Sequence, residues 1–283
     1  MADTLSFTMQ FSSIPLLGRF LSPSSRFAAP DDACFRWLRM SDCDGREMVA
    51  KRAASGGWRT FERPMPEFFH RACRASAGIV IDVGANSGFY SLLAAASRRD
   101  IRVLAIEPDP LVKPILEHNI RLNWLDRRIT TLPIALSDRQ GVAELFIPSR
   151  EHGLVEKSSS LERTFKPAHS DVIRVETDTL DGLRLRLPGG ARKVGVIKID
   201  VEGHETAVLR GATATIGTDR PLIFVELLPR ADFAWLNELL RNHDYRDMPL
   251  QNSGPPLPGT TVSFDPEAAN HLFLPTERAG SFS

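Results

Sequence analysis

From Ile79 onward, the chain repeats one pattern, a short apolar run followed in most cases by a segment of helix-forming residues. The runs are IVIDVG, RVLAIEP, ITTLPIALS, VGVIKIDVEG and PLIFVELLP, and the helical segments include FYSLLAAASRR and ETAVLRGA. Strands that alternate with helices indicate a parallel sheet covered by helices on both faces. The expected fold class is therefore α/β. Ligands of such sheets bind at the carboxyl ends of the strands, so residues that follow the runs are the first candidates for a site.

Charge and cysteine content exclude several classes of protein. The 283 residues carry 35 basic and 35 acidic side chains, a net charge of +0. A nucleic-acid partner is not expected, because such binders normally carry a basic excess. Three cysteines, Cys34, Cys43 and Cys73, lack the spacing of a zinc site and suit a reducing compartment. The N-terminus makes a poor signal peptide and no apolar run is long enough to span a bilayer, so we expect a cytoplasmic protein.

Composition divides the chain into three expected parts. Residues 1–75 form an N-terminal extension of loops and helices that serves as a cap or arm, residues 76–250 form the α/β domain, and residues 251–283 form a C-terminal tail packed on it. Aromatic side chains of the extension are expected to close a binding cleft or to form a dimer contact, and they are Phe7, Phe11, Phe20, Phe27, Phe35 and Trp37. The polar stretch Ser149–Asp171, with His152, Lys157, Ser158–Ser160 and His169, is a candidate lid or acceptor-binding loop, or a solvated excursion.

The turn after the first run, DVGANSG, is not a dinucleotide fingerprint. Counted from Gly84, Asn86 and Phe89 stand where that motif needs its second and third glycines. Asp82, directly before the turn, is a poor neighbour for a pyrophosphate but suits a ligand with positive charge. S-adenosylmethionine carries an ammonium and a sulfonium, and the turn resembles the acid-x-G-x-x-x-G turn of class I methyltransferases. The alternative is an ordinary turn that needs glycine only for its backbone.

Two further acids extend the cofactor hypothesis. Glu107 ends the second run about twenty residues after the glycine turn, where an acid can accept hydrogen bonds from both hydroxyls of a ribose. Asp109 adds to the ribose edge or caps the next helix. The segment Ala135–Asp138 is positioned to offer backbone groups and one acid, Asp138, to the adenine. Asp138 is equally well explained as a turn residue.

The run VGVIKIDVEGHE carries charges on an otherwise apolar strand. Lys198, Asp200 and Glu202 recur at period two and so project from one face, and His204 stands at a helix start. Three interpretations compete. The charges pair within the sheet while Glu202 caps the helix, or one of Asp200, Glu202 and His204 is a general base, or D-x-E-x-H binds a divalent metal. The metal interpretation lacks further ligands, and Glu226 at the next strand end orients His204 or the acceptor, or is a simple cap.

The segments DVGANSGFYS, AIEPDP, PIALSD, TDTLDGL, IKIDVEGHETAVLRGA and PLIFVEL resemble, in this order, the FkbM family of S-adenosylmethionine-dependent methyltransferases. The resemblance covers about Ile79 to Arg246 and implies a class I methyltransferase fold, which is Rossmann-like, with helices on both faces of the sheet. It also implies transfer to an oxygen of a sugar or of a polyketide or other natural product. No metal ligand is assigned, and the expected reaction-side residues are Asp200, Glu202 and His204. The expected cofactor-binding residues are Asp82, Gly84, Ala85, Asn86, Ser87, Gly88, Glu107 and Asp138.

The expected activity is thus O-methylation of a hydroxyl on a sugar, glycan, glycolipid or polyketide-type small molecule, with S-adenosylmethionine as cofactor. In-line transfer would need alignment of the acceptor and a carboxylate or histidine base. Two alternatives stay open, a nicotinamide-dependent oxidoreductase on a similar fold and a non-catalytic cofactor-binding protein. The sequence leaves the acceptor and the oligomeric state undetermined.

Overall fold

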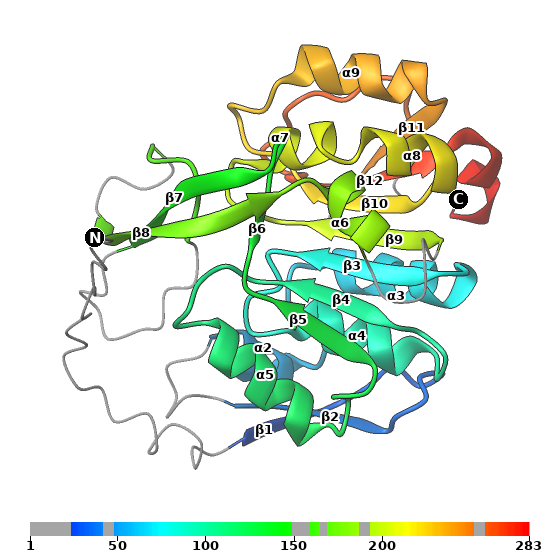
Figure 1. The fold of residues 1–283 in the computed structure, drawn as a ribbon. Helices are drawn as coiled ribbons and strands as arrows, with labels where there is room; N and C mark the ends of the chain where they lie inside the picture. Colours follow the sequence, from blue (N-terminus) through cyan, green and yellow to red (C-terminus); the bar gives the residue numbers. More distant parts are fainter. Residues whose placement is uncertain are drawn as a thin grey trace, which may run out of the picture.

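A computed structural model describes residues 24–41, 48–148, 159–164, 169–186, 193–251 and 258–282. Within these ranges, the centre of the fold is a seven-stranded sheet (Figure 1). From one edge to the other, its strands are β11 (Tyr245–Pro249), β12 (Asn270–Pro275), β10 (Leu222–Glu226), β9 (Val194–Ile199), β3 (Ile79–Val83), β4 (Val103–Ile106) and β5 (Ile129–Leu132).

The sheet is parallel except for β12, which pairs antiparallel with both β10 and β11. The chain starts the sheet at β3, continues through β4 to β5, and then returns to the other side of β3 to add β9 and β10. The strand order therefore reverses between β3 and β9, and a crevice at such a reversal is where sheets of this kind bind ligands. The α/β fold class predicted from the sequence is confirmed.

Helices cover both faces of the sheet (Figure 1). Each face has its own hydrophobic core. Alternation along the central strand explains the division, because Val80 joins one core while Ile79 and Ile81 join the other. On the first face lie α2 (Met48–Gly56), α3 (Met65–Ala75), α4 (Phe89–Ser97) and α5 (Lys113–Leu122). On the second face lie α6 (Leu180–Arg186), α7 (Glu205–Arg210), α8 (Thr213–Asp219) and α9 (Phe233–Asn242).

The N-terminal extension packs on the first face. It forms a hairpin that the sequence did not indicate, of β1 (Ser24–Ala28) and β2 (Trp37–Ser41). Backbone N–H groups of this hairpin donate hydrogen bonds to the side chains of Asn119 on α5, at 2.7 Å, and of Asn123 directly after that helix, at 2.9 Å. Phe27 lies in the same core, with its ring centroid 6.1 Å from that of Phe89. The predicted aromatic residues Phe7, Phe11 and Phe20 lie outside the described residues.

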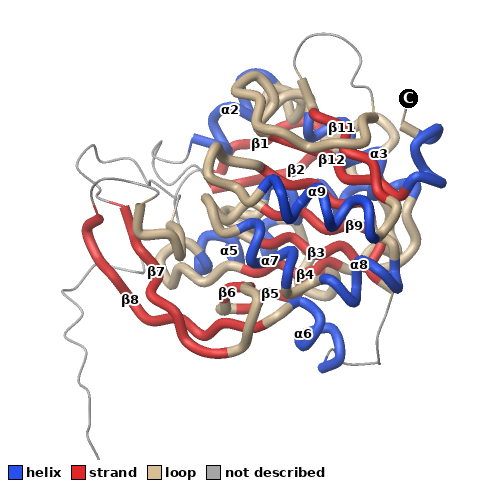
Figure 2. The backbone as a smooth tube through the Cα atoms, turned by 90° about the horizontal axis from the view of Figure 1, so that it is seen from above, coloured by secondary structure: helices blue, strands red, loops and turns tan. Residues whose placement is uncertain are grey.

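A second, three-stranded sheet stands beside the first and is formed by β6 (Ala135–Leu136), β8 (His169–Asp178) and β7 (Gly141–Pro148). Figure 2 shows the β7–β8 hairpin projecting to one side of the main sheet. The run ITTLPIALS, predicted as one strand, is divided between the two sheets at Pro133, which has no N–H to donate to a strand ladder.

The tail completes the main sheet by supplying β12, and it ends in a 3-10 helix, η1 (Thr276–Ser281). β12 lies between β10 and β11, which both precede it in the chain. Among the described residues, no helix is both long and apolar enough to cross a membrane.

Candidate active site

The glycine turn joins β3 to α4 and lies against the end of β9. Gly84, Asn86 and Gly88 all have positive φ, at +75°, +50° and +95°. A Cβ on Gly84 would lie 1.8 Å from the carbonyl oxygen of Asp200, so only glycine fits at this contact. The turn therefore brings the backbone of β3 against the residue that the sequence singled out on the next strand.

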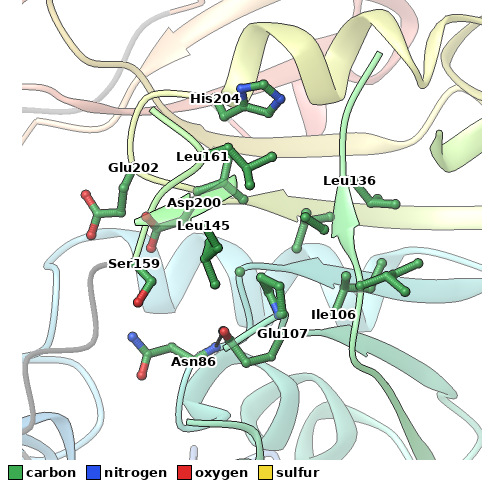
Figure 3. Close-up of a pocket in the computed structure, with 16 residues that line it drawn as sticks. Asn86, Ile106, Glu107, Leu136, Leu145, Ser159, Leu161, Asp200, Glu202 and His204 are labelled. Atoms are coloured by element: carbon green, nitrogen blue, oxygen red, sulfur yellow. Dashed lines mark hydrogen bonds between the residues drawn. The ribbon is translucent and has the colours of Figure 1, made fainter. Parts of the chain in front are cut away.

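A pocket opens at the carboxyl ends of β3, β4 and β9 (Figure 3). It contains about 580 Å³ of empty space, a volume that includes open solvent at its mouth. The residues that line it are Val83, Gly84, Asn86, Ile106, Glu107, Pro108, Ile134, Ala135, Leu136, Leu145, Ser159, Leu161, Asp200, Val201, Glu202 and His204. Its walls thus combine apolar side chains with a few carboxylates, as a site for an amphipathic ligand requires.

The structure brings six of the eleven predicted site residues together in this lining, namely Gly84, Asn86, Glu107, Asp200, Glu202 and His204. The other five lie elsewhere. Asp82, Ala85 and Ser87 are buried in and behind the turn, Gly88 is the N-cap of α4, and Asp138 is exposed to solvent. The cofactor roles of these five residues stay predictions. The apolar residues Ile106, Ile134 and Leu145 were not predicted, because an apolar residue at a strand end has the same pattern as a core residue.

Glu107 links the turn to the second strand. Its side chain is only 7% exposed, and its two oxygens accept hydrogen bonds from the backbone N–H groups of Asn86 at 2.8 Å and Asp109 at 2.9 Å. Burial raises the pKa of Glu107 to about 7, against the partial compensation of these hydrogen bonds. Each carboxylate oxygen has a second lone pair, so Glu107 can still accept hydrogen bonds from two ligand hydroxyls.

Asp82 is fully buried behind the turn, and one of its oxygens lacks a hydrogen-bond partner. Oδ2 accepts a hydrogen bond of 2.6 Å from Ser91, while the buried Oδ1 has no partner among the described residues. Burial raises the pKa of Asp82, and the charge of Lys198, its register partner on β9, opposes that rise. A buried carboxylate oxygen without a donor fits a site completed by a cationic ligand, such as the ammonium of the expected cofactor.

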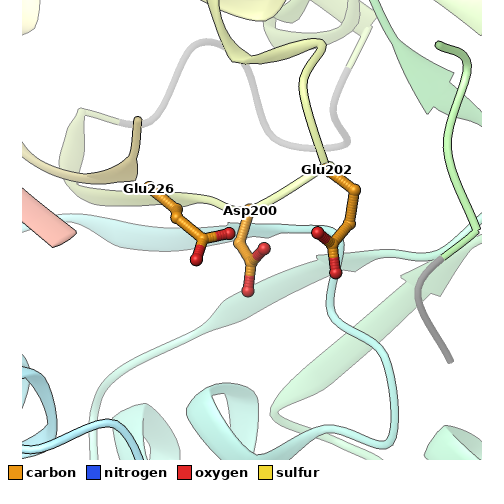
Figure 4. Close-up of side chains that lie close together, drawn as sticks. All are labelled: Asp200, Glu202 and Glu226. Carbon is orange, nitrogen blue, oxygen red and sulfur yellow. The ribbon is translucent and has the colours of Figure 1, made fainter. Parts of the chain in front are cut away.

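Asp200, Glu202 and Glu226 gather at the ends of β9 and β10, with carboxylate oxygens within 4.8 Å of one another (Figure 4). Lys198 donates a hydrogen bond of 2.9 Å to Oδ2 of Asp200. The ion pair of the first interpretation is therefore present. Burial, with the charges of Asp200 and Glu202, raises the pKa of Glu226 to about 9. Glu226 is thus protonated at neutral pH.

Glu226 adds a carboxylate to Asp200 and Glu202, and it is a further possible metal ligand of the kind that the sequence did not identify. The Lys198 ammonium bound to Asp200 argues against a divalent ion there, because it already neutralises one carboxylate and would repel a second cation. The predicted capping role of Glu202 is wrong, because α7 begins after His204 with no capping hydrogen bond from a side chain. The carboxylate of Glu205 accepts hydrogen bonds from the N–H groups of Val201 and Gly203, in the turn before the helix.

His204 is oriented by a residue that the sequence did not indicate. Its Nδ1 lies 2.8 Å from Oε1 of Glu162, and its Nε2 lies 3.0 Å from Oγ of Ser137. A carboxylate only accepts, so Nδ1 carries the proton and Nε2 accepts from the serine when the ring is neutral. Glu226, which the sequence offered as an alternative orienting residue, lies with Asp200 instead.

Glu162 belongs to the described part of the candidate lid, residues 159–164. Ser159 Oγ donates to Asp109 Oδ2 at 2.7 Å, and Ser160 Oγ donates to the Glu202 carbonyl at 2.8 Å. Ser159 and Leu161 also line the pocket, so this segment forms one of its walls. His152, Lys157 and Ser158 lie outside the described residues. No pattern in the sequence could have paired Glu162 with His204, 42 residues away.

The strand order, the glycine turn against β9 and the acid at the end of β4 define the class I methyltransferase architecture. Residues 82–247 match the Methyltransferase FkbM domain. The chain belongs to this family of methyltransferases, whose cofactor, as the sequence predicted, is S-adenosylmethionine.

Individual proteins that resemble this chain share low sequence identity with it. Methyltransferase sdnD of Sordaria araneosa is 26% identical over 153 residues, which are 47% of this chain and 59% of that protein. The crystal structure of methyltransferase FkbM from Methylobacillus flagellatus is 17% identical, with a TM-score of 0.47 over 70% of this chain and 43% of that one. A SAM-dependent methyltransferase from Agrobacterium tumefaciens is 12% identical, with a TM-score of 0.42 over 78% and 62%. The chain thus spans less than two thirds of each of these proteins.

Proposed function

We propose that the protein transfers a methyl group from S-adenosylmethionine to a hydroxyl of a sugar, glycan, glycolipid or polyketide-type small molecule. The observation that carries the proposal is the position of Asp200, an ionisable residue in the pocket wall, in contact with the glycine turn and beside a second carboxyl group. A hydroxyl is a very weak acid, so its methylation benefits from a base at the point of attack.

Gly84, Asn86 and Glu107 are the residues proposed to hold the cofactor. Gly84 lets the backbone of the turn lie against Asp200 in the pocket wall, and Glu107 is proposed to accept hydrogen bonds from the two ribose hydroxyls. The backbone of Ala135 and Leu136, which line the same pocket, is proposed to border the adenine. S-adenosylmethionine, when bound, supplies an electrophilic methyl group on a sulfonium.

Asp200 is proposed to accept the hydroxyl proton as the acceptor oxygen takes the methyl group. Lys198 fixes Oδ2 of Asp200, which leaves Oδ1 as the oxygen for the acceptor. Burial raises the pKa of the nearby Glu226 to about 9, and a carboxyl with so perturbed a pKa beside the proposed base is characteristic of functional sites. His204 is the weaker candidate for the base, because Glu162 and Ser137 engage both of its ring nitrogens.

The deciding experiment begins with calorimetric titration of the protein with S-adenosylmethionine, S-adenosylhomocysteine and NAD. Methyl transfer from radiolabelled cofactor is then measured to a panel of methyl glycosides and polyketide alcohols. Binding of the two adenosyl ligands and labelling of a hydroxyl support the proposal. Binding of NAD alone would identify a nicotinamide-dependent oxidoreductase. Cofactor binding with no transfer to any panel member would contradict transfer to these hydroxyls and favour a non-catalytic binding protein.

A further inference from the structure

The N-terminal extension places one acidic side chain beside the proposed base. Phe61 and Glu62 lie directly before α3, and the ring of Phe61 packs edge-on against that of Phe89, with centroids 5.1 Å apart. The backbone carbonyl of Glu62 accepts a hydrogen bond of 3.0 Å from the N–H of Met65. Glu62 has φ of +50°, a region that side-chain-bearing residues rarely adopt. Packing and backbone therefore hold Glu62 in a conformation that local preference disfavours, as is common at functional sites.

A continuous set of contacts runs from Glu62 to Asp200. Tyr90 Oη donates a hydrogen bond of 2.8 Å to Oε2 of Glu62. The ammonium of Lys198 lies 4.9 Å from the centroid of the Tyr90 ring, and it donates to Asp200 at 2.9 Å. Tyr90 and Lys198 are 4% and 3% exposed, so solvent screens these interactions little.

Lys198 is held by carboxylates on more than one side. Burial alone would lower its pKa, but the charges of Asp200, Asp82 and Glu62 outweigh burial and raise it. Burial and the charge of Asp200 raise the pKa of Glu62 itself to about 7. The ionisable groups that face Glu62 come from α4, from β9 and the segment after it, and from β10, and they are Tyr90, Lys198, Asp200, Glu202 and Glu226.

We propose that Glu62 is a positioning residue of the methyl-transfer site, contributed by the N-terminal extension, whereas the residues that line the pocket lie between Val83 and His204. Through Tyr90 and Lys198, it holds the Asp200 carboxylate in place for the acceptor hydroxyl. This inference rests on the proposed function, in which Asp200 is the base. A structural role alone would not select this residue, because an acid among other acids is less stable than an amide of the same shape.

The test compares Glu62→Gln with Glu62→Asp and with a matched control, Glu67→Gln. Glu67 is an acid of the same extension that pairs with Arg59 at the surface. The measurements are S-adenosylhomocysteine affinity by calorimetry, kcat and KM against pH for the acceptor selected from the hydroxyl panel, and melting temperature at pH 5 and pH 8.

In Glu62→Gln, we expect kcat to fall by about tenfold to a hundredfold, as for a small misplacement of a reacting group, while S-adenosylhomocysteine affinity stays unchanged. The acidic limb of the kcat profile should move to lower pH, because the remaining carboxylates ionise more readily without a negative neighbour. Glu62→Asp, which keeps the charge, should recover part of kcat, and Glu67→Gln should match the wild type. A wild-type kcat and pH profile in Glu62→Gln, or a parallel loss of S-adenosylhomocysteine affinity, would overturn the proposal.

The melting temperatures separate this inference from the proposed function. Between pH 5 and pH 8 the melting temperature of the wild type should fall by more than that of Glu62→Gln, because only the wild type must ionise a buried Glu62. If the wild type methylates no panel hydroxyl, the proposed function fails. In that case the smaller pH dependence of Glu62→Gln would still support the placement of Glu62 among the site carboxylates, and equal pH dependence would refute it.

Discussion

Glu107 offers the sharpest test of the cofactor site, because its two oxygens already hold the backbone of two loops. Glu107→Ala would leave the N–H groups of Asn86 and Asp109 without their acceptors, and each such buried group costs about 1–3 kcal/mol of stability. Loss of binding in that variant would be confounded with loss of the fold. Glu107→Gln keeps the shape and one acceptor oxygen, so it is the better perturbation.

The expected loss of affinity in Glu107→Gln follows from the hydrogen bonds that the ligand would lose. Hydrogen bonds to a charged group contribute about 1.5–3 kcal/mol, so removal of the charge and of one acceptor should weaken S-adenosylhomocysteine binding by about tenfold to a hundredfold. The pH dependence gives a second signature. The pKa of Glu107 is about 7, and hydroxyl donors favour its ionised form. Affinity of the wild type should therefore rise between pH 6 and pH 8, while that of Glu107→Gln should stay flat.

Calorimetric titration with S-adenosylhomocysteine at several pH values measures both effects, and a melting curve confirms that each variant is folded. Asp126→Asn is the matched control, because Asp126 is an exposed acid that lies outside the pocket lining. Its affinity should equal that of the wild type. A folded Glu107→Gln variant that binds S-adenosylhomocysteine as tightly as the wild type would refute the ribose assignment.

Three further outcomes are expected. Asp200→Asn should spare S-adenosylhomocysteine binding and lower kcat by about a hundredfold to ten-thousandfold, the usual range for a general base. His204→Ala should lower kcat less. An equal loss of S-adenosylhomocysteine binding in both variants would show that the roles are wrongly divided. Dialysis against EDTA should leave methyl transfer unchanged because Lys198 occupies Asp200, and loss of transfer that Mg²⁺ restores would assign a metal to the three carboxylates. The free energy of unfolding should fall as pH rises from about 5 to 9, because burial raises the pKa of Glu205 to about 7 and that of Glu226 to about 9. Over this range the native state keeps protons that the unfolded chain releases. Chemical denaturation at several pH values measures the fall, and a flat profile would contradict the burial of these acids.

The pattern of apolar residues along the sequence predicted those strands whose residues are all buried. The central strands are buried on both faces and so appear as continuous apolar runs, which is why Ile79–Val83 was found within a residue. The run VGVIKIDVEG starts where β9 starts, at Val194, but extends four residues beyond its end at Ile199. β12 was missed because it lies in the tail, outside the alternation of strands and helices, and the hairpin of β1 and β2 was missed because its side chains alternate only partly. The strand break at Pro133 was indicated, but which sheet each half joins depends on contacts distant in sequence.

The same division holds for the site. Residues that follow a strand, such as Glu107 and Asp200, were predictable because the topology brings every parallel strand end to one edge. Glu162 and Glu62 were not, since each reaches the site from a segment without regular structure, through a contact formed only in the folded chain. Asp82 shows another limit, because its position before the turn does not reveal that its side chain is fully buried and outside the pocket lining, and its cofactor role stays a prediction.

The place of β12 has a consequence for how the protein is made. β10, which carries Glu226, has β9 on one side, but its other hydrogen-bonding edge is covered only by residues 270–275. During synthesis, a chain emerging from the ribosome can pair β3, β4, β5, β9 and β10 early, yet this edge stays unpaired until residues 270–275 have been made. Until then, the nascent sheet presents unpaired backbone groups of the kind that promote association between chains. A premature stop before residue 270 would therefore produce a chain that carries the glycine turn and the acids but is prone to aggregate.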